Sequence, residues 1–343
     1  MNKFFNIPDT EKRLIFQEIA NKTGMPPYAV EKDWWVVQTL ALVFELEIGK
    51  HLVFKGGTSL SKAWNLIHRF SEDIDLAVDR SFFGFKKELS KKERTNLRKT
   101  SSTYIQNILK PLLEKKFTDN GFTKIDIKLT KATTSDQDPR IIEIYYPNIT
   151  KTTSYIMPRI LLEIGSRSLR EPFTIQSFNA LVDAGFPNTN FSNKPIRIPT
   201  VNPERTFLEK LFLLHEEFHR PKERIRTDRL SRHLYDIYQL IESEFAEKAI
   251  NNKELYTTIV KHRYAFTKVG YIDYNLLQPQ TLNPLPPKEL DKAWKKDYQT
   301  MQEQMIYGDS PSYENMILKI DTFIKELNQV NWKMDVVFPK PKQ

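Results

Sequence analysis

Residues 54–62 read FKGGTSLSK, and residues 69–76 read RFSEDIDL. The apolar run that begins at Leu52 predicts a short buried strand, and the glycine pair after it predicts a turn. Ser59–His68 should then form a helix, and Ile74–Val78 has the apolar character of a second strand. The two stretches therefore predict a compact unit of strand, turn, helix and strand.

The glycine pair in the first stretch is suited to binding phosphate. Gly56 and Gly57 lack side chains, so the backbone can approach a ligand closely and direct several N–H groups at it. The N-terminus of the following helix adds the positive end of its dipole. Thr58 and Ser59 offer hydroxyl donors, and Ser59 is also a candidate N-cap. Paired glycines beside hydroxyls also occur at ordinary turns, so this motif does not establish a nucleotide site by itself.

Two aspartates in the second stretch make the nucleotide interpretation stronger. Alternate side chains of a strand share a face, so Asp73 and Asp75 should project together while Ile74 and Leu76 enter the core. Adjacent carboxylates raise each other's pKa unless a cation lies between them, and a divalent ion with oxygen ligands suits that position. Solvated acids at the end of a strand are the simpler alternative. The phosphate-binding turn one short helix upstream favours the metal site.

The composition of the 343-residue chain excludes several kinds of site. It contains no cysteine, so disulfides, thiolate nucleophiles and cysteine zinc sites are excluded, and any metal must be bound by oxygen or imidazole. The formal net charge of +9 favours an anionic partner such as nucleic acid or a nucleotide. The N-terminus does not resemble a signal peptide, and the apolar run Trp34–Phe44 is far shorter than the roughly 20 residues of a membrane span. We therefore expect a cytoplasmic protein without a membrane partner.

The pattern along the chain predicts an α+β fold of two lobes. Strand candidates lie at Lys124–Leu129, Arg140–Tyr146 and Arg159–Ile164, after a helical region over residues 9–49. Long helical periodicity begins after Pro203. We expect residues 1–200 to form a lobe with a mixed sheet and flanking helices, and residues 201–343 to form a mostly helical lobe. The helices expected in the second lobe are Glu204–His219, Arg229–Glu247, Glu289–Tyr307 and Ser312–Val330.

These motifs resemble those of the AbiEii/AbiGii toxin family of nucleotidyltransferases, within the DNA polymerase β-like superfamily. The two stretches quoted above carry the resemblance, together with Glu31-Lys32-Asp33 upstream, Glu209-Lys210, and RHLYDI at residues 232–237. The resemblance spans about residues 25–245. It implies a nucleotidyltransferase lobe with a mixed sheet, a helical C-terminal lobe, and the activity of a bacterial toxin–antitoxin or abortive-infection system.

The resemblance implies a role for each residue that its motifs match. Asp73 and Asp75 would bind the metal, and Ser71 would line the site beside them. Lys210 would contact the triphosphate, and Asp236 would be the acid of the last family motif. Each of the last two has a simpler interpretation, because Lys210 has the spacing of an ordinary surface lysine and Asp236 could serve only to fix a nearby arginine such as Arg232.

Superfamily members also use a third carboxylate on a neighbouring strand. Glu163 is our candidate, because it is an acid inside the apolar run of residues 160–164. Glu143 lies in a run of the same form and is its rival. Glu163 could instead be an ion-pair partner of Arg159 or Arg167. We expect Glu163 to be the third metal ligand.

The implied activity is transfer of a nucleoside monophosphate from a nucleoside triphosphate to an acceptor, with Mg²⁺ or Mn²⁺ as cofactor. The expected acceptor is the 3′ end of tRNA or another RNA, and a cognate antitoxin protein is a further expected partner. Two metal ions about 4 Å apart would stabilise the attacking and leaving oxygens. Lys210 would reach the triphosphate from the second lobe, which makes the interlobe cleft the expected active site. A catalytically inactive nucleic-acid-binding protein of the same fold is the alternative.

Basic residues gather between the first two helices of the second lobe. Their charge suits contact with RNA phosphates. A solvated basic loop is an equally simple explanation. The residues that we assign to nucleic-acid binding are Arg224, Arg226, Arg229 and Arg232.

Residues 215–219 read HEEFH and match H-E-x-x-H, the pattern of a helical zinc site. A zinc hydrolase is a weak alternative, because Glu217 places a charge between the two ligands, Pro221 ends the helix almost at once, and no clear third ligand follows in an apolar helical setting. We expect His215 to pack inward and His219 to cap the helix C-terminus instead.

Overall fold

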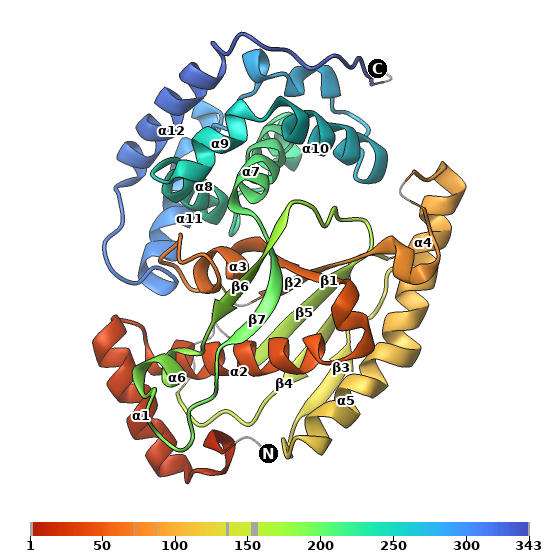
Figure 1. Ribbon diagram of the computed structural model, residues 1–343. Helices are drawn as coiled ribbons and strands as arrows, with labels where there is room; N and C mark the ends of the chain where they lie inside the picture. Colours follow the sequence, from red (N-terminus) through yellow and green to blue (C-terminus); the bar gives the residue numbers. More distant parts are fainter. Residues whose placement is uncertain (1–2, 72, 87, 135–136, 152–156, 342–343) are drawn as a thin grey trace. The chain divides into compact units, whose positions relative to one another are not determined.

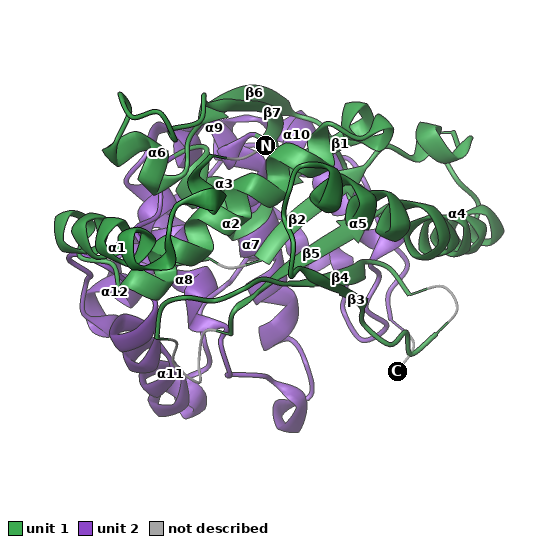
Figure 2. Cartoon of the chain, turned by 90° about the horizontal axis from the view of Figure 1, so that it is seen from below, with its two compact units in different colours: residues 1–64, 70–201 green, residues 65–69, 202–343 purple. Residues whose placement is uncertain are grey.

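The structure is a computed structural model that describes residues 3–71, 73–86, 88–134, 137–151 and 157–341 (Figure 1). The chain divides into two compact units, which Figure 2 distinguishes by colour. Unit 1 comprises Met1–Trp64 and Phe70–Val201, and unit 2 comprises Asn65–Arg69 and Asn202–Gln343. The short segment Asn65–Arg69 therefore belongs to unit 2 although unit 1 flanks it on both sides in the sequence.

Unit 1 is built on a seven-stranded mixed sheet with the order β3-β4-β5-β2-β1-β7-β6. The pairs β2·β5 and β1·β7 are parallel, and the other four pairs are antiparallel. This confirms the predicted α+β fold with a mixed sheet. The strands are β1 (Leu52–Lys55), β2 (Asp73–Val78), β3 (Asp126–Leu129), β4 (Arg140–Tyr145), β5 (Arg159–Gly165), β6 (Phe173–Phe178) and β7 (Ile196–Val201).

Helix α2 (Pro27–Phe44) forms the centre of the core of unit 1. Nearly all of its residues are buried, and it packs against β5 and β7 and against α1, α5 and α6 (Figure 1). Pro27 fits the first turn because the N–H that proline lacks would have no helical acceptor there. The other helices are α1 (Asp9–Thr23), α3 (Gly56–Lys62), α4 (Lys91–Tyr104), α5 (Lys110–Asp119) and α6 (Leu181–Gly185). The shorter turns are η1 (Phe4–Asn6), η2 (Glu47–His51), η3 (Arg80–Phe83) and the π-helical η4 (Ile105–Leu109).

The bounds of α3 correct the predicted helix Ser59–His68. The helix begins at Gly56, three residues earlier, and it ends at Lys62. Its N-cap is Lys55, whose side chain makes no capping hydrogen bond, so Ser59 is not the N-cap. Gly56 has a φ of 81°, which residues with a side chain rarely adopt, and this conformation lets the strand turn directly into the helix.

Unit 2 is mostly helical, as predicted. The predicted helix Arg229–Glu247 is two helices, because the first ends at Ile241 and the Oγ of Ser243 caps the second by accepting from the N–H of Phe245. None of the described helices is long and apolar enough to cross a membrane. The helices of unit 2 are α7 (Pro203–Phe218), α8 (Ser231–Ile241), α9 (Glu244–Asn251), α10 (Lys253–Phe266), α11 (Asp291–Gln304) and α12 (Tyr313–Leu327). The short 3-10 turns are η5 (Lys222–Arg224), η6 (Tyr274–Leu277), η7 (Pro279–Thr281) and η8 (Lys288–Leu290).

Candidate active site

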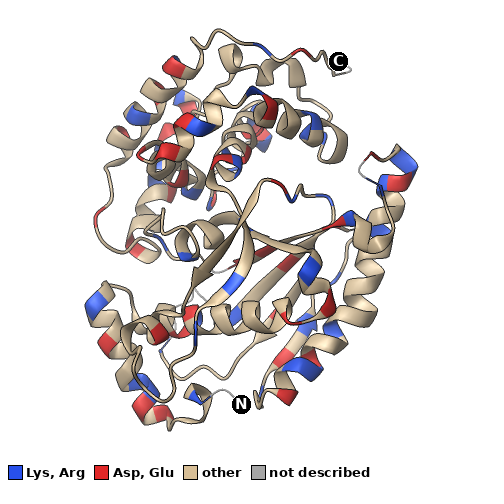
Figure 3. Ribbon diagram, in the orientation of Figure 1, with Lys and Arg blue, Asp and Glu red and all other residues tan. Residues whose placement is uncertain are grey.

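Strand β2 presents two carboxylates on one face of the sheet. Asp73 and Asp75 are half-buried, whereas Ile74 and Leu76 between and after them are buried. The alternation of a strand therefore projects the two acids together, as expected. Figure 3 shows acidic residues on the central strands of the sheet. Glu72, the acid that precedes them in the motif, lies outside the described residues.

Glu163 lies beside these acids on the neighbouring strand. In the parallel pair of β2 and β5, Asp75 is in register with Glu163, and Asp73 is in register with Leu161. Side chains in register on adjacent strands point to the same face of a sheet. Three carboxylates from two strands therefore share one face.

The rival acid Glu143 has partners of its own. Its Oε2 lies 2.6 Å from Arg159 Nη1, and it also accepts a hydrogen bond from the hydroxyl of Tyr145. Arg167, the other suggested partner of Glu163, forms an ion pair with Asp138. Both arginines that we suggested as partners of Glu163 thus form ion pairs with other acids, and Glu163 stays our candidate for the third carboxylate.

Gly56 packs directly against Asp75. A Cβ atom added to Gly56 would lie 2.1 Å from Asp75 Oδ2, which is closer than any real contact, and the φ of 81° already disfavours a side chain. This close approach brings the start of α3 beside the carboxylates. The first N–H groups of a helix have no acceptor within it, so those of Gly56 and Gly57 are available at this point.

The hydroxyls of Thr58 and Ser59 are buried and already used within unit 1. Thr58 Oγ1 donates to the carbonyl of Asp73 and lies 2.9 Å from Ser71 Oγ. Ser59 Oγ donates to the carbonyl of Gly56 at 2.8 Å. We expected these hydroxyls to face a phosphate, but they instead fix α3 to β2 and brace its first turn. The Thr58 contact also holds Ser71 close to the aspartates.

The far end of α3 is fixed as well, by the acid of the Glu31-Lys32-Asp33 motif. Asp33 is buried in α2, and its Oδ1 lies 2.5 Å from Lys62 Nζ at the last residue of α3. Its other carboxylate oxygen accepts from the N–H of Leu181 at 2.7 Å. The glycine turn is thus positioned through both ends of its helix.

The donors on this face fit magnesium. Magnesium is usually bound by one or two carboxylates together with substrate phosphates, and Asp73 and Asp75 supply the carboxylates. Among the residues that the structure describes, no group of three or more histidines or acids is arranged to hold a metal ion. The carboxylates therefore suit an ion that is bound jointly with a nucleotide better than a complete protein metal site.

Unit 2 contains a buried cluster of charges around Asp236. Three charged residues form this cluster and are almost fully buried. Arg69, Lys210 and Asp236 are 2%, 7% and 0% exposed. Arg69 binds Asp236 through both carboxylate oxygens, at 2.6 and 2.7 Å, and Lys210 Nζ lies 2.8 Å from Oδ2. The arginine that Asp236 fixes is therefore Arg69 and not Arg232, and Lys210 is not an ordinary surface lysine.

The charges in this cluster shift the pKa values of its members. Burial lowers the pKa of the Lys210 ammonium, although Asp236 opposes this effect. Burial alone would raise the pKa of Asp236, but Arg69 and Lys210 hold it well below its ordinary value. His233, whose Nδ1 lies 3.4 Å from Lys210 Nζ, has a pKa well below the usual value because of burial and the nearby cations. Lys210 and Arg69 thus share one carboxylate oxygen, Asp236 Oδ2.

The four arginines assigned to nucleic acid differ in exposure. Arg224 and Arg226 are exposed, whereas Arg229 and Arg232 are half-buried. The side chain of Arg226 is 58% exposed even though its guanidinium binds Glu217, with Nη2 and Oε2 2.6 Å apart. Arg224 and Arg226 are thus the members of this set that are open to a large ligand.

The two histidines of HEEFH lie where we expected them. His215 is buried, burial and the neighbouring His219 lower its pKa to about 3, and its Nδ1 accepts from the N–H of Asn283. His219 is the C-cap of α7, with Nδ1 2.7 Å from the carbonyl of His215. Glu216, which would be the base of a zinc hydrolase, forms an ion pair with Arg263. These contacts give the motif a structural role.

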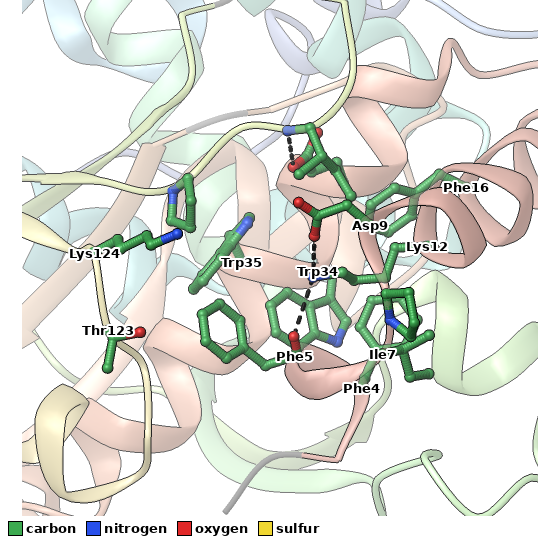
Figure 4. A pocket seen from close by; sticks show the side chains of 14 residues that line it. Phe4, Phe5, Ile7, Asp9, Lys12, Phe16, Trp34, Trp35, Thr123 and Lys124 are labelled. Carbon is green, nitrogen blue, oxygen red and sulfur yellow. Dashed lines mark hydrogen bonds and ion pairs between the residues drawn. The ribbon is translucent and has the colours of Figure 1, made fainter.

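Unit 1 also contains a pocket of about 240 Å³, which is lined by none of the predicted site residues (Figure 4). Its walls include Phe5, Trp34 and Trp35 from η1 and α2. The Lys12 ammonium inside it is held by Asp9 at 2.8 Å and by the carbonyl of Phe5 at 3.1 Å. The pocket contains no residue of β1, α3 or β2, so it is separate from the carboxylate face.

Two residues near these clusters had no role in the sequence interpretation. Arg69 stands in the second motif, but its partner Asp236 is 167 positions away in the sequence. Lys55 directly precedes the glycine pair. It lies at the end of β1, opposite Asp75 of β2. A lysine next to a phosphate-binding turn was a signal that the sequence already contained.

Comparison with known proteins gives one family match. The model described as nucleotidyl transferase AbiEii toxin, type IV toxin–antitoxin system, matches residues 42–332. No curated protein matches the chain. JHP933 from Helicobacter pylori has 14% identity and a TM-score of 0.41, covering 85% of this chain and 90% of its own. The nucleotidyltransferase toxin MenT4 from Mycobacterium tuberculosis has 14% identity and a TM-score of 0.44, covering 92% and 98%. The family match spans most of the chain.

Proposed function

Because the chain belongs to the AbiEii family of nucleotidyltransferase toxins, we propose that it transfers a nucleoside monophosphate to the 3′ end of tRNA or another RNA, with Mg²⁺ or Mn²⁺. Family membership makes it a nucleotidyltransferase; the metal and the RNA acceptor are our proposal. The observation that carries the proposal is the pair Asp73 and Asp75 on one face of β2, with the backbone of Gly56 against Asp75.

The residues of unit 1 have distinct tasks in this reaction. Asp73 and Asp75 hold the metal, with Glu163 as third acid, and the bound metal supplies charge stabilisation for the attacking and leaving oxygens. The N–H groups of Gly56 and Gly57 bind phosphate oxygens, which they can do without reorganising. Ser71 lines the site, and Thr58 and Ser59 contribute backbone N–H groups and the bracing of α3. The RNA 3′ oxygen bonds to the α-phosphorus, the bond to the β-phosphate oxygen breaks, pyrophosphate leaves, and the hydroxyl proton passes to solvent.

In unit 2 we propose that Lys210 is a phosphate-binding cation that Asp236 positions. The shared carboxylate supports this role, because Lys210 divides Asp236 Oδ2 with Arg69 and a phosphate would offer its ammonium further charge-assisted hydrogen bonds. The proposed contacts with RNA phosphates are made by Arg224, Arg226, Arg229 and Arg232, and the exposure of Arg224 and Arg226 supports them best. The family description as a type IV toxin–antitoxin system supports a cognate antitoxin as partner.

The proposal is tested by incubating the protein with each α-³²P-labelled nucleoside triphosphate, Mg²⁺ and total tRNA. We expect label on RNA with the unaltered protein and a loss on the order of 10³-fold in Asp73→Ala and Asp75→Ala, because each removes a charged metal ligand. Glu163→Gln should lose activity, and Glu143→Gln on the adjacent strand should keep it. Full transfer by Asp73→Ala would contradict the proposal. Tight RNA binding without transfer from any nucleotide would favour the inactive binding protein.

A further inference from the structure

Lys55 completes a row of charged side chains across three strands of unit 1. In the antiparallel pair of β1 and β2, Lys55 lies opposite Asp75, and on the other side Asp75 is in register with Glu163. Residues directly opposite on paired strands have Cβ atoms about 5 Å apart and share a face. Lys55 is therefore the cation next to the proposed metal-binding acids, on the side from which α3 begins.

The sheet face is open at this row and closed one step further along. Val53 and Ala77 are the next pair on the same face of β1 and β2, and both are fully buried. Lys55 and Asp75, in contrast, are half-buried. The Lys55 side chain thus lies where the covered part of the face ends, and its ammonium can meet a ligand from solvent.

The charge of Lys55 is not used within the described part of the chain. Within the described residues, no hydrogen bond or ion pair holds the Lys55 Nζ. This holds even for Asp75, which lies directly opposite on β2 and carries the opposite charge. Lys62, at the other end of α3, is the contrast, because its ammonium lies 2.5 Å from Asp33. Lys62 is structural by its contacts, whereas Lys55 offers a free cation at the N-cap of α3.

We propose that Lys55 binds the β- and γ-phosphates of the nucleoside triphosphate and the pyrophosphate that leaves. This inference rests on the proposed function. Lys55 directly precedes Gly56, so its ammonium and the free N–H groups of the turn serve the same phosphate groups. Lysine is a compact cation with three donors, which suits phosphate oxygens. Negative charge grows on the pyrophosphate oxygen as its bond to the α-phosphorus breaks, and a cation placed there stabilises that charge.

The test measures binding directly with three variants, Lys55→Ala, Lys55→Arg and Lys50→Ala. Lys50 is the matched control, because it is an exposed lysine of η2 in the same unit. Isothermal titration in Mg²⁺ uses each of the four nucleoside triphosphates, the matching monophosphates, and pyrophosphate. We expect Lys55→Ala to weaken triphosphate and pyrophosphate binding about 10- to 100-fold, the range for a hydrogen bond to a charged group, and to leave monophosphate binding unchanged. Lys55→Arg should restore most of the binding, and Lys50→Ala should match the unaltered protein.

Two results would overturn the assignment of Lys55. Equal weakening of mono- and triphosphates by Lys55→Ala would indicate distortion of the turn, and unchanged triphosphate binding with weakened RNA binding would place Lys55 on the acceptor. Thermal unfolding of each variant shows whether it folds. If Lys55→Ala does not fold, Lys55→Arg still tests whether a cation at this position binds triphosphate. If the unaltered protein binds and transfers none of the four nucleotides, the proposed function itself fails. If it binds them and Lys55→Ala binds them equally well, only the role of Lys55 fails.

Discussion

The carboxylate face of unit 1 and the charge cluster of unit 2 use the same kinds of side chain in opposite ways. Asp73 and Asp75 are half-buried acids that share a strand face, where their mutual repulsion favours a bound cation. Asp236 is fully buried, and Arg69 and Lys210 already neutralise it. The difference separates acids on a half-exposed strand face from a buried acid that two cations bind, and it predicts different consequences of substitution.

The largest effect on stability should come from the cluster of unit 2. Asp236→Ala leaves two buried cations without their anion, so we expect the free energy of unfolding to fall by about 3–5 kcal/mol. Asp335→Ala is the control, because Asp335 forms an exposed ion pair with Lys253, and it should cost at most about 1 kcal/mol. Urea unfolding measures both values. Equal losses in the two variants would show that burial does not set the strength of the Asp236 contacts.

Acid should weaken the protein through His215. Its folded pKa of about 3 lies below the ordinary 6.5, so the unfolded chain takes up a proton first as the pH falls. This contribution to stability is complete above pH 6.5 and is lost as the pH falls toward 3, by at most about 1.4 kcal/mol per pH unit. Asp236 acts in the same direction below its ordinary pKa. His233, whose pKa is also well below the usual value, adds to the loss in the same range. His215→Gln should therefore reduce the pH dependence between pH 6.5 and 4.5 in urea unfolding without abolishing it, and an unchanged slope would refute the role of His215.

The smallest expected effect on stability comes from two glycine substitutions in unit 1, which separate the cost of a strained backbone from the cost of a collision with Asp75. Gly56→Ala and Gly84→Ala both place a side chain at positive φ, of 81° and 79°, so each should lower stability by about 1–2 kcal/mol. Only the Cβ at position 56 would collide with Asp75, since nothing lies within 4 Å of the position at Gly84. We therefore expect Gly56→Ala to lose label transfer and Gly84→Ala to keep it. Equal transfer by both would argue against the closeness of turn and carboxylate as a functional feature.

The central strands of the sheet could be predicted because burial gives them strong patterns. β2 and β5 carry buried apolar residues at alternate positions, and their acids stand out against them. The edge strand β6 was missed, since only Phe178 among its residues is buried and the strand carries a weak pattern. Helix α10 was missed although Leu255, Tyr256, Ile259 and Val260 have helical spacing, because polar residues surround them.

The candidate site was predicted less completely than the fold. The face shared by Asp73 and Asp75 follows from local alternation, which the sequence contains. The bond between Arg69 and Asp236 depends on the tertiary fold, which brings together residues that no local pattern connects. The start of α3 at Gly56 was missed because Ser59 is a good N-cap by residue type, whereas the backbone conformation of Gly56 decided the outcome.

The segment Asn65–Arg69 has a consequence for dividing the protein experimentally. Cleavage after Val201 would give an N-terminal fragment that keeps Arg69 without its carboxylate and a C-terminal fragment that keeps Asp236 and Lys210 without the guanidinium. The N-terminal fragment would contain all of unit 1, whereas the C-terminal fragment would lack Asn65–Arg69, a segment of its own compact unit. The C-terminal piece should therefore regain the ion pair of Arg69 and Asp236 only when the N-terminal piece is expressed with it.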